Sequence, residues 1–213
     1  MWDRKHTYLF IVLAGIFVTN AILAELIGGK LIPVLGTVMS LGILPWPIVF
    51  LTTDLVNEYF GKKSVHFLSW LTVALILYCF LVLQIGIDLP TATISSISHA
   101  EFTSVFGQGQ WIIIGSCIAF LVSQLLDAYL FSSIKAKTGN KWLWMRSTGS
   151  TVVSQLIDSF IVLGIAFYLP GIIDFNTFIL SGLTGYSIKL LIAIGLTPLI
   201  YLGHAAIDRY LGK

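Results

Sequence analysis

The sequence predicts an all-α integral membrane protein with six transmembrane helices and both termini on the inner side. Hydrophobic residues make up 57% of its 213 residues and charged residues only 10%, and the mean hydropathy is +0.93. No soluble domain of this length has such a composition. The length is sufficient for one membrane domain, so residues 1–213 are predicted to form a single transmembrane domain.

Six apolar segments reach the ~20 residues that a helix needs to cross the hydrocarbon layer of a bilayer. They cover residues 7–28, 41–60, 64–87, 110–132, 148–169 and 177–207. The first segment follows Arg4 and Lys5, as the apolar part of a signal peptide would. It is too long for a signal peptide and lacks a good small-residue cleavage site, so we expect a retained helix.

Glycine and proline mark the connection between the first and second segments. Residues 29–40 include Pro33 and Gly36 and are too few to cross a membrane. They predict a short hairpin or a re-entrant turn at the surface. Pro45 and Pro47 then fall in the first turns of the second helix, where proline is tolerated.

The basic residues predict the orientation, because Lys and Arg gather in the inner loops of membrane proteins. With the N-terminus inside, ten of the twelve lie in inner segments: Arg4, Lys5, Lys62, Lys63, Lys135, Lys137, Lys141, Arg146, Arg209 and Lys213. The outer loops 88–109 and 170–176 contain acidic residues but no Lys or Arg. The charges therefore favour a topology with both termini inside.

Two neighbouring spans contain nearly the same polar pentapeptide. Residues 123–127 read Ser-Gln-Leu-Leu-Asp, and residues 154–158 read Ser-Gln-Leu-Ile-Asp. Side chains three residues apart share a helix face, and a carboxylate inside a membrane is expensive enough to indicate a function. Because the two helices are antiparallel, the pentapeptides are expected to face each other in reversed sense, as inverted repeats of transporters do.

Seven polar residues within the predicted spans are the candidates for binding a ligand: Asn20, Asp54, Gln124, Asp127, Gln155, Asp158 and Lys189. Asp158 lies near the middle of its span, and Lys189 is also deep. A buried ammonium group needs a carboxylate, so these two residues are predicted to pair. Such a pair would lock two helices together, frame a ligand, or do both.

Two other acidic residues are expected to have structural roles and not to bind a ligand. Glu58 lies one helical turn before Lys62 and is predicted to pair with it at the inner surface. Glu25 lies near the outer end of its helix, where it would meet water or Lys30.

The sequence contains no arrangement typical of an enzyme. The HExxH, GxSxG and P-loop motifs are absent. Cys79 and Cys117 lie in apolar segments without the spacing of a metal site or a disulfide framework. We therefore expect neither catalysis nor a cofactor.

The candidate residues suit a flat polar heterocycle. A carboxylate can accept two hydrogen bonds from the donor edge of a guanine-type ring, and amides can bind a ring carbonyl or nitrogen. Aromatic residues, 13% of the chain, offer stacking surfaces. Amino acids, amines and vitamins would also fit these groups.

Several motifs resemble the queuosine precursor transporter family, a group of vitamin uptake transporters. One is Thr-Asp-Leu-Val-Asn-Glu-Tyr-Phe-Gly-Lys-Lys at 53–63, and the two pentapeptides are others. The resemblance continues at 141–144 (Lys-Trp-Leu-Trp), 146–151 (Arg-Ser-Thr-Gly-Ser-Thr) and 186–189 (Tyr-Ser-Ile-Lys). It covers residues 8–207 in the same order and spacing.

This resemblance implies a single transmembrane transporter domain of six helices in the cell inner membrane. It implies import of 7-cyano-7-deazaguanine, 7-aminomethyl-7-deazaguanine or both, for the salvage of queuosine in tRNA. The implied partners are this small molecule and the lipid bilayer, with no nucleic acid. A homodimer or a separate coupling subunit stays open.

The chemistry of a deazaguanine suggests roles for the candidate residues. Asp127 or Asp158 would accept the donor edge of the ring, and the two glutamines would bind its carbonyl and pyrrole side. Asn20 would assist, and Lys189 would keep Asp158 charged. Asp54 would face the ammonium group of the aminomethyl form.

A second interpretation is the substrate-binding subunit of an energy-coupling-factor transporter for a vitamin-like compound. Such subunits also have six helices and no ATPase of their own. The chain has no clear Ala-x-x-x-Ala contact motif of the kind that such subunits often use, which favours a solitary carrier. The energy source stays open between proton coupling, facilitated diffusion and a coupling factor.

Overall fold

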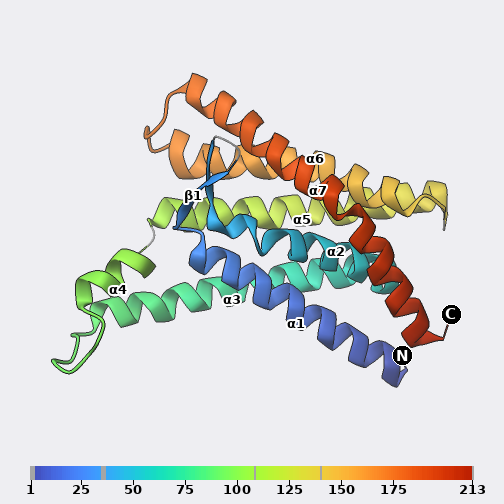
Figure 1. Cartoon of the computed structure of the whole chain (residues 1–213), viewed down its shortest axis with the longest axis horizontal. Helices are drawn as coiled ribbons and strands as arrows, with labels where there is room; N and C mark the ends of the chain where they lie inside the picture. Colours follow the sequence, from blue (N-terminus) through green and yellow to red (C-terminus); the bar gives the residue numbers. More distant parts are fainter. Residues whose placement is uncertain (1–2, 35–36, 108, 140, 213) are drawn as a thin grey trace.

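The computed structural model describes residues 3–34, 37–107, 109–139 and 141–212, and most of them are helical (Figure 1). The α-helices are α1 Arg4–Ile27, α2 Trp46–Phe60, α3 Lys62–Asp88, α4 His99–Phe106, α5 Gln110–Thr138, α6 Leu143–Leu163 and α7 Phe175–Leu211. The remaining elements are strands β1 Leu31–Val34 and β2 Thr37–Ser40, the 3₁₀ turn η1 Leu41–Ile43 and the π-helical turn η2 Gly164–Tyr168.

Five helical segments within the described residues are long and apolar enough to cross a membrane. They are Arg4–Ile27, Lys62–Asp88, His99–Thr138, Leu143–Tyr168 and Phe175–Leu211. The prediction is therefore confirmed for five of the six expected spans, all except the second.

The expected second span, residues 41–60, is not one of the five. It is divided between η1 and α2, and α2 has 15 residues. That length gives about 22 Å of helix, whereas the hydrocarbon layer is about 30 Å thick. Pro45 precedes the first helical residue and Pro47 lies in the first turn, and neither has an N–H that could extend the helix upstream. Six predicted spans are thus corrected to five candidate spans and one shorter helix.

Both termini lie at the same end of the molecule, as Figure 1 shows. Lys5 Nζ donates to the backbone oxygen of Tyr210 at 3.2 Å, so the start of α1 lies against the end of α7. The short helix α2 leads the chain back to this end, where Gly61 separates it from α3 with a φ of 79°. A topology with both termini inside requires this arrangement.

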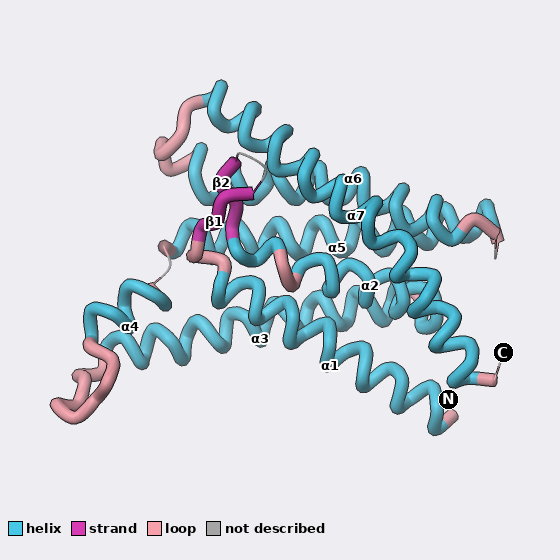
Figure 2. The backbone as a smooth tube through the Cα atoms, in the orientation of Figure 1, coloured by secondary structure: helices cyan, strands magenta, loops and turns pink. Residues whose placement is uncertain are grey.

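The hairpin expected between the first two helices is confirmed as the antiparallel pair β1 and β2, with Leu31 opposite Ser40. Ser40 Oγ donates to the backbone oxygen of Gly28 at 2.8 Å and accepts from the backbone N–H of Gly42 at 3.1 Å. These bonds attach the hairpin to the end of α1 that lies opposite the termini, as the magenta strands in Figure 2 show.

Helix α5 packs closely against both parts of the following helical segment, α6 and η2. A Cβ atom on Gly115 of α5 would lie 3.2 Å from the backbone nitrogen of Ala166 in η2. The missing side chain therefore lets the two backbones approach, as small residues commonly do between membrane helices.

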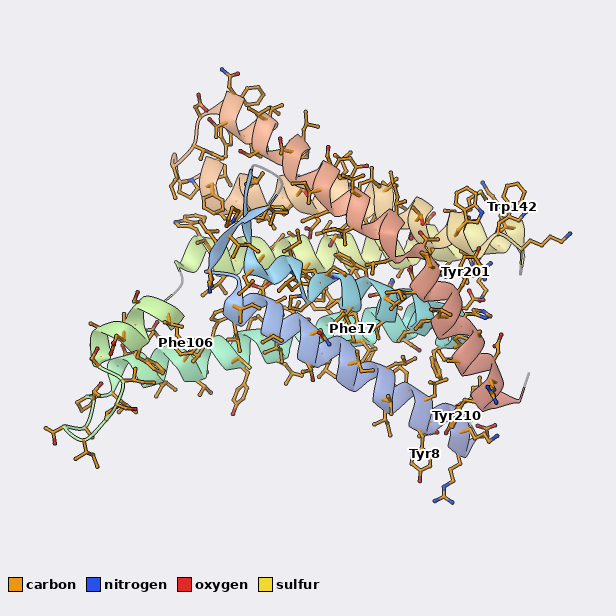
Figure 3. The ribbon with its side chains drawn as sticks, viewed as in Figure 1. Tyr8, Phe17, Phe106, Trp142, Tyr201 and Tyr210 are labelled. Atoms are coloured by element: carbon orange, nitrogen blue, oxygen red, sulfur yellow. The ribbon has the colours of Figure 1, made fainter. Side chains whose placement is uncertain are left out.

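Apolar side chains are divided between an inner core and the outer surface. Phe17, Val56 and Leu68 belong to a buried cluster that joins α1, α2 and α3. Large apolar side chains are also exposed on every long helix, as a surface in contact with lipid requires. Tyr8 and Trp142 lie near the end that carries the termini (Figure 3), where aromatic residues commonly anchor a protein at the membrane interface.

Candidate functional site

A cavity of ≈ 370 Å³ lies among α1, the hairpin, α2, α5, α6, η2 and α7. Small-molecule sites typically have volumes of about 300–1,000 Å³ and mainly apolar walls with a few polar groups. Most residues that line this cavity are apolar, and the polar ones are Glu25, Ser40, Asp54, Ser116, Ser147, Thr148, Thr151, Asp158, Lys189 and Thr197. The cavity therefore has the size and composition of a ligand site.

The predicted ion pair between Asp158 of α6 and Lys189 of α7 is confirmed. Lys189 Nζ lies 2.7 Å from Asp158 Oδ2, and the two side chains are 27% and 15% exposed. Ser123 Oγ of α5 donates to Asp158 Oδ1 at 3.1 Å. Both charged residues line the cavity. The pair thus joins neighbouring helices and also presents an ammonium and a carboxylate to the cavity.

The two similar pentapeptides bond to each other reciprocally. Ser123 of the first donates to Asp158 of the second, and Ser154 of the second donates to Asp127 of the first at 2.9 Å. The expectation that they face each other in reversed sense is confirmed. The reciprocal bonds fix the register between α5 and α6 at the depth of the cavity.

The two glutamines of these pentapeptides are buried but do not line the cavity. Gln124 Oε1 accepts a hydrogen bond from Thr53 Oγ1 of α2 at 3.0 Å. Gln155 Oε1 has no hydrogen-bond partner among the described residues. Asp127 is buried behind the cavity wall, and Asn20 Nδ2 donates to the backbone oxygen of Ile16 on its own helix at 2.9 Å.

Of the seven candidate residues, the structure brings three to the cavity: Asp54, Asp158 and Lys189. Asp54 is 4% exposed and lies beside the first turns of α6, where Ser147 Oγ donates to its Oδ2. Its other oxygen, Oδ1, is buried and has no hydrogen-bond partner in the described part of the chain.

Glu25 lines the cavity although it was not among the seven candidate residues. It is 7% exposed, and Ser116 Oγ of α5 donates to its Oε2 at 2.7 Å. From its position near a helix end, Glu25 was expected to meet water or Lys30. The hairpin covers that end, so the carboxylate faces the cavity instead. Its place as an acidic residue within a predicted span was a signal that could have identified it.

Aromatic rings form one wall of the cavity. Trp46 and Phe50 of α2 are stacked, with ring centroids 6.0 Å apart and an interplanar angle of 16°. Trp46 also contacts Phe120 of α5, with a centroid distance of 5.4 Å. All three residues line the cavity, so a planar ligand can stack against this wall.

The predicted pair between Glu58 and Lys62 is wrong. Glu58 Oε1 lies 2.9 Å from Arg146 of α6 and 3.1 Å from Lys135 of α5. Lys62 Nζ instead lies over the Tyr129 ring, 5.7 Å from its centroid. The prediction assumed that a helical turn reaches from Glu58 to Lys62, whereas α2 ends at Phe60 and a new helix starts at Lys62.

This ion cluster extends to α7 at the end of the molecule that carries the termini. Tyr59 OH donates to Asp208 Oδ1 at 2.8 Å, and His204 Nδ1 lies 2.9 Å from Asp208 Oδ2. Arg146, which is 1% exposed, also donates to the backbone oxygen of Gly139 at 3.0 Å. The cluster therefore ties α2, α5, α6 and α7 together on this side of the cavity.

Among the residues that the structure describes, no group of three or more His, Cys, Asp or Glu side chains is placed to hold a metal ion. The charged residues that line the cavity are Glu25, Asp54, Asp158 and Lys189.

A family model described as "Putative vitamin uptake transporter" matches residues 40–203. The chain belongs to this vitamin uptake transporter family. A protein of Bacillus subtilis (strain 168) named "Probable queuosine precursor transporter" is 32% identical over 173 residues, or 81% of this chain and 74% of that protein. A protein of Haemophilus influenzae (strain ATCC 51907 / DSM 11121 / KW20 / Rd) with the same name is 27% identical over 128 residues, or 60% of this chain and 51% of that protein. No solved structure matches the chain.

As a member of the vitamin uptake transporter family, the chain is a multi-pass membrane protein and a transporter, not an enzyme. The region that matches the family model contains Asp54, Asp158 and Lys189, and Glu25 precedes it. Three of the four charged residues in the cavity wall therefore lie in the region that matches the family model.

Proposed function

We propose that the chain, as a single transmembrane transporter domain, imports the 7-deazaguanine precursors of queuosine across the cell inner membrane. The names of the two relatives support this substrate. The observation that carries the proposal is the Asp158–Lys189 pair in the wall of a cavity that also contains stacked aromatic rings.

In this proposal, Asp158 binds hydrogen-bond donors of the ring and Lys189 binds an acceptor of the same ring. The ring N–H and the exocyclic amino group of a deazaguanine are adjacent donors, and one carboxylate can accept both. Each oxygen of Asp158 accepts one bond at present, from Ser123 or Lys189, and therefore has a lone pair left. The ammonium of Lys189 can donate to the ring carbonyl. The aromatic wall around Trp46 supplies the stacking surface.

The other candidate residues would bind a substituent of the ring or support the cavity wall. Asp54 would meet the substituent at position 7 of the ring, where its carboxyl group suits the ammonium of the aminomethyl form. Gln124 and Asp127 would hold α5 against its neighbours in this state, through their bonds with Thr53 and Ser154. Gln155 is buried and does not line the cavity. These three residues and Asn20 would contact the ligand in a conformation in which the helices have moved.

Calorimetric titration of the detergent-purified protein tests this function. We expect saturable binding of 7-cyano- or 7-aminomethyl-7-deazaguanine and no comparable binding of guanine or of a panel of vitamins. Asp158→Asn should weaken binding by about tenfold or more, because hydrogen bonds to a charged group contribute roughly 1.5–3 kcal/mol. Asp88→Asn is the matched control, since Asp88 lies exposed at the end of α3 away from the cavity.

Binding of a vitamin without binding of either deazaguanine would contradict the proposal. That result would favour the substrate-binding subunit of a coupling-factor transporter. Equal affinities of the wild-type protein and Asp158→Asn would show that the ligand does not bind at the ion pair.

A further inference from the structure

Asp54 is a buried carboxylate in the cavity wall and, unlike Asp158 and Glu58, it is not paired with a cation in the described part of the chain. Asp158 pairs with Lys189 at 2.7 Å, and Glu58 pairs with Arg146 at 2.9 Å. Asp54 is 4% exposed, receives a hydrogen bond from Ser147, and takes part in no ion pair within the described residues. Its buried Oδ1 has no hydrogen-bond partner there, and the residue lines the cavity.

The charged groups around Asp54 do not offer compensation. Asp127 of α5 and Glu58 of α2 add negative charge, and the cation nearby is Arg146 of α6. Arg146 is already bound to Glu58 and to backbone oxygens of the loop before α6. From α7, His204 lies near Glu58, with 3.9 Å between Nε2 and Oε1. An ionised Asp54 would therefore be a buried, unbalanced anion, which is strongly unfavourable inside a membrane.

We infer that Asp54 carries a proton and that the transporter couples uptake to the inward movement of this proton. This inference rests on the proposed function and adds its energy source. A proton from the water in the cavity binds the carboxylate of Asp54 and removes its charge. When the opposite end opens, the same proton leaves to the water there and Asp54 becomes an anion again. In each cycle Asp54 binds one proton on the outer side and releases it on the inner side, so no other reactant is needed.

The ion cluster explains how release can be linked to opening. Asp54 and Glu58 are four residues apart on α2 and share one face of the helix. If opening of this end separates Arg146 from Glu58, the guanidinium becomes able to stabilise the anionic form of Asp54. Water entering through the opened end then takes up the proton. The cluster thus couples the exit path of the ligand to the exit path of the proton.

Reconstitution of the purified protein in liposomes tests the inference, with radiolabelled 7-cyano-7-deazaguanine as the probe. This neutral form is chosen because the ammonium of the aminomethyl form could replace the proton at Asp54. For the wild-type protein, we expect an inward proton gradient to drive accumulation, up to about tenfold per unit of pH difference. A pH-sensitive dye inside the liposomes should record proton entry that starts when the ligand is added.

The variants separate a proton carrier from a residue that only binds ligand. Asp54→Asn should lose proton entry, and any transport that remains should no longer respond to the gradient. Asp54→Glu, which keeps a carboxyl group, should retain the response to the gradient. Asp88→Asn should behave like the wild-type protein. If Asp54→Asn does not fold, Asp54→Ser replaces it as the neutral variant.

Three results would overturn the inference. One is a wild-type protein that exchanges ligand across the membrane but does not respond to the proton gradient. Another is residual transport by Asp54→Asn that still responds to the gradient. The third is acceleration by a sodium gradient at constant pH. Absence of ligand exchange by the wild-type protein would instead contradict the proposed function.

Discussion

Serine hydroxyl groups donate hydrogen bonds to the carboxylates at the centre of the helix bundle. Ser123 and Ser154 each donate to the aspartate of the neighbouring helix, and Ser147 donates to Asp54. A hydroxyl is small enough to fit between closely packed helices and can donate without adding a charge. A hydroxyl therefore bonds to a buried carboxyl group whether or not a basic residue is close to it.

The reciprocal bonds predict a measurable loss of stability when one hydroxyl is removed. Ser154→Ala removes the hydroxyl that donates to the buried Asp127. We expect a cost of about 1–3 kcal/mol, because a buried acceptor is left without that partner, and a lower melting temperature in detergent. Ser187→Ala is the control, since this exposed hydroxyl bonds to a carbonyl oxygen of its own helix. Equal melting temperatures of the two variants would contradict a stabilising role of the reciprocal bond.

Some residues of the site could be predicted from the sequence and others could not. Asp158 and Lys189 were predictable as a pair because both lie deep in apolar segments, where a charge needs a partner. Glu25 was not selected, because its protection depends on a hairpin that follows it in the chain. The two glutamines are buried away from the cavity, and Gln124 bonds to Thr53 of α2 instead, which depends on how the helices pack.

At the scale of elements, small residues determine how closely helices approach. Residues 181–185 of α7 read Ser-Gly-Leu-Thr-Gly, a small-residue pattern that commonly allows close packing. The two glycines differ in the structure. A Cβ atom on Gly182 would lie 2.7 Å from Cε1 of Phe160 in α6, whereas nothing lies within 4 Å of one on Gly185.

This difference predicts opposite effects of the same substitution. Gly182→Ala should destabilise the contact between α6 and α7 by about 1–3 kcal/mol, because the ring of Phe160 or a backbone must move. Gly185→Ala should be neutral or slightly stabilising, because alanine favours a helix more than glycine does. Thermal unfolding of both variants measures the effect. A melting temperature for Gly182→Ala at or above that of Gly185→Ala would contradict the packing.

Helix composition was sufficient to predict five spans, since a long apolar segment has few alternatives to crossing a membrane. The expected second span was too long because Pro45 and Pro47 lie at the start of α2 and prevent the helix from extending towards residue 41. The expected Glu58–Lys62 pair was wrong because a break at Gly61 replaces the assumed helical turn. Overall hydropathy therefore located the apolar segments, but it did not predict where proline and glycine interrupt the helices.

At the scale of the whole molecule, the cavity lies between two differently constructed ends. The hairpin closes over one end, where Leu31 and Met39 line the cavity. The other end carries both termini (Figure 1) and the ion cluster around Glu58 and Arg146. A carrier must open each end in turn, so we expect the hairpin and the ion cluster to be the parts that move.

If the proposed deazaguanine substrate passes through the cavity, a side chain that fills the cavity should block its uptake. Ala193→Phe places a ring in the cavity, and Ala205→Phe makes the same change at an exposed position of the same helix. Uptake of radiolabelled 7-cyano-7-deazaguanine by cells that express each variant is the measurement. We predict that Ala193→Phe reduces uptake to the level of cells without the transporter, whereas Ala205→Phe transports like the wild-type protein. Equal uptake by both variants, at equal amounts of folded protein in the membrane, would contradict passage through the cavity.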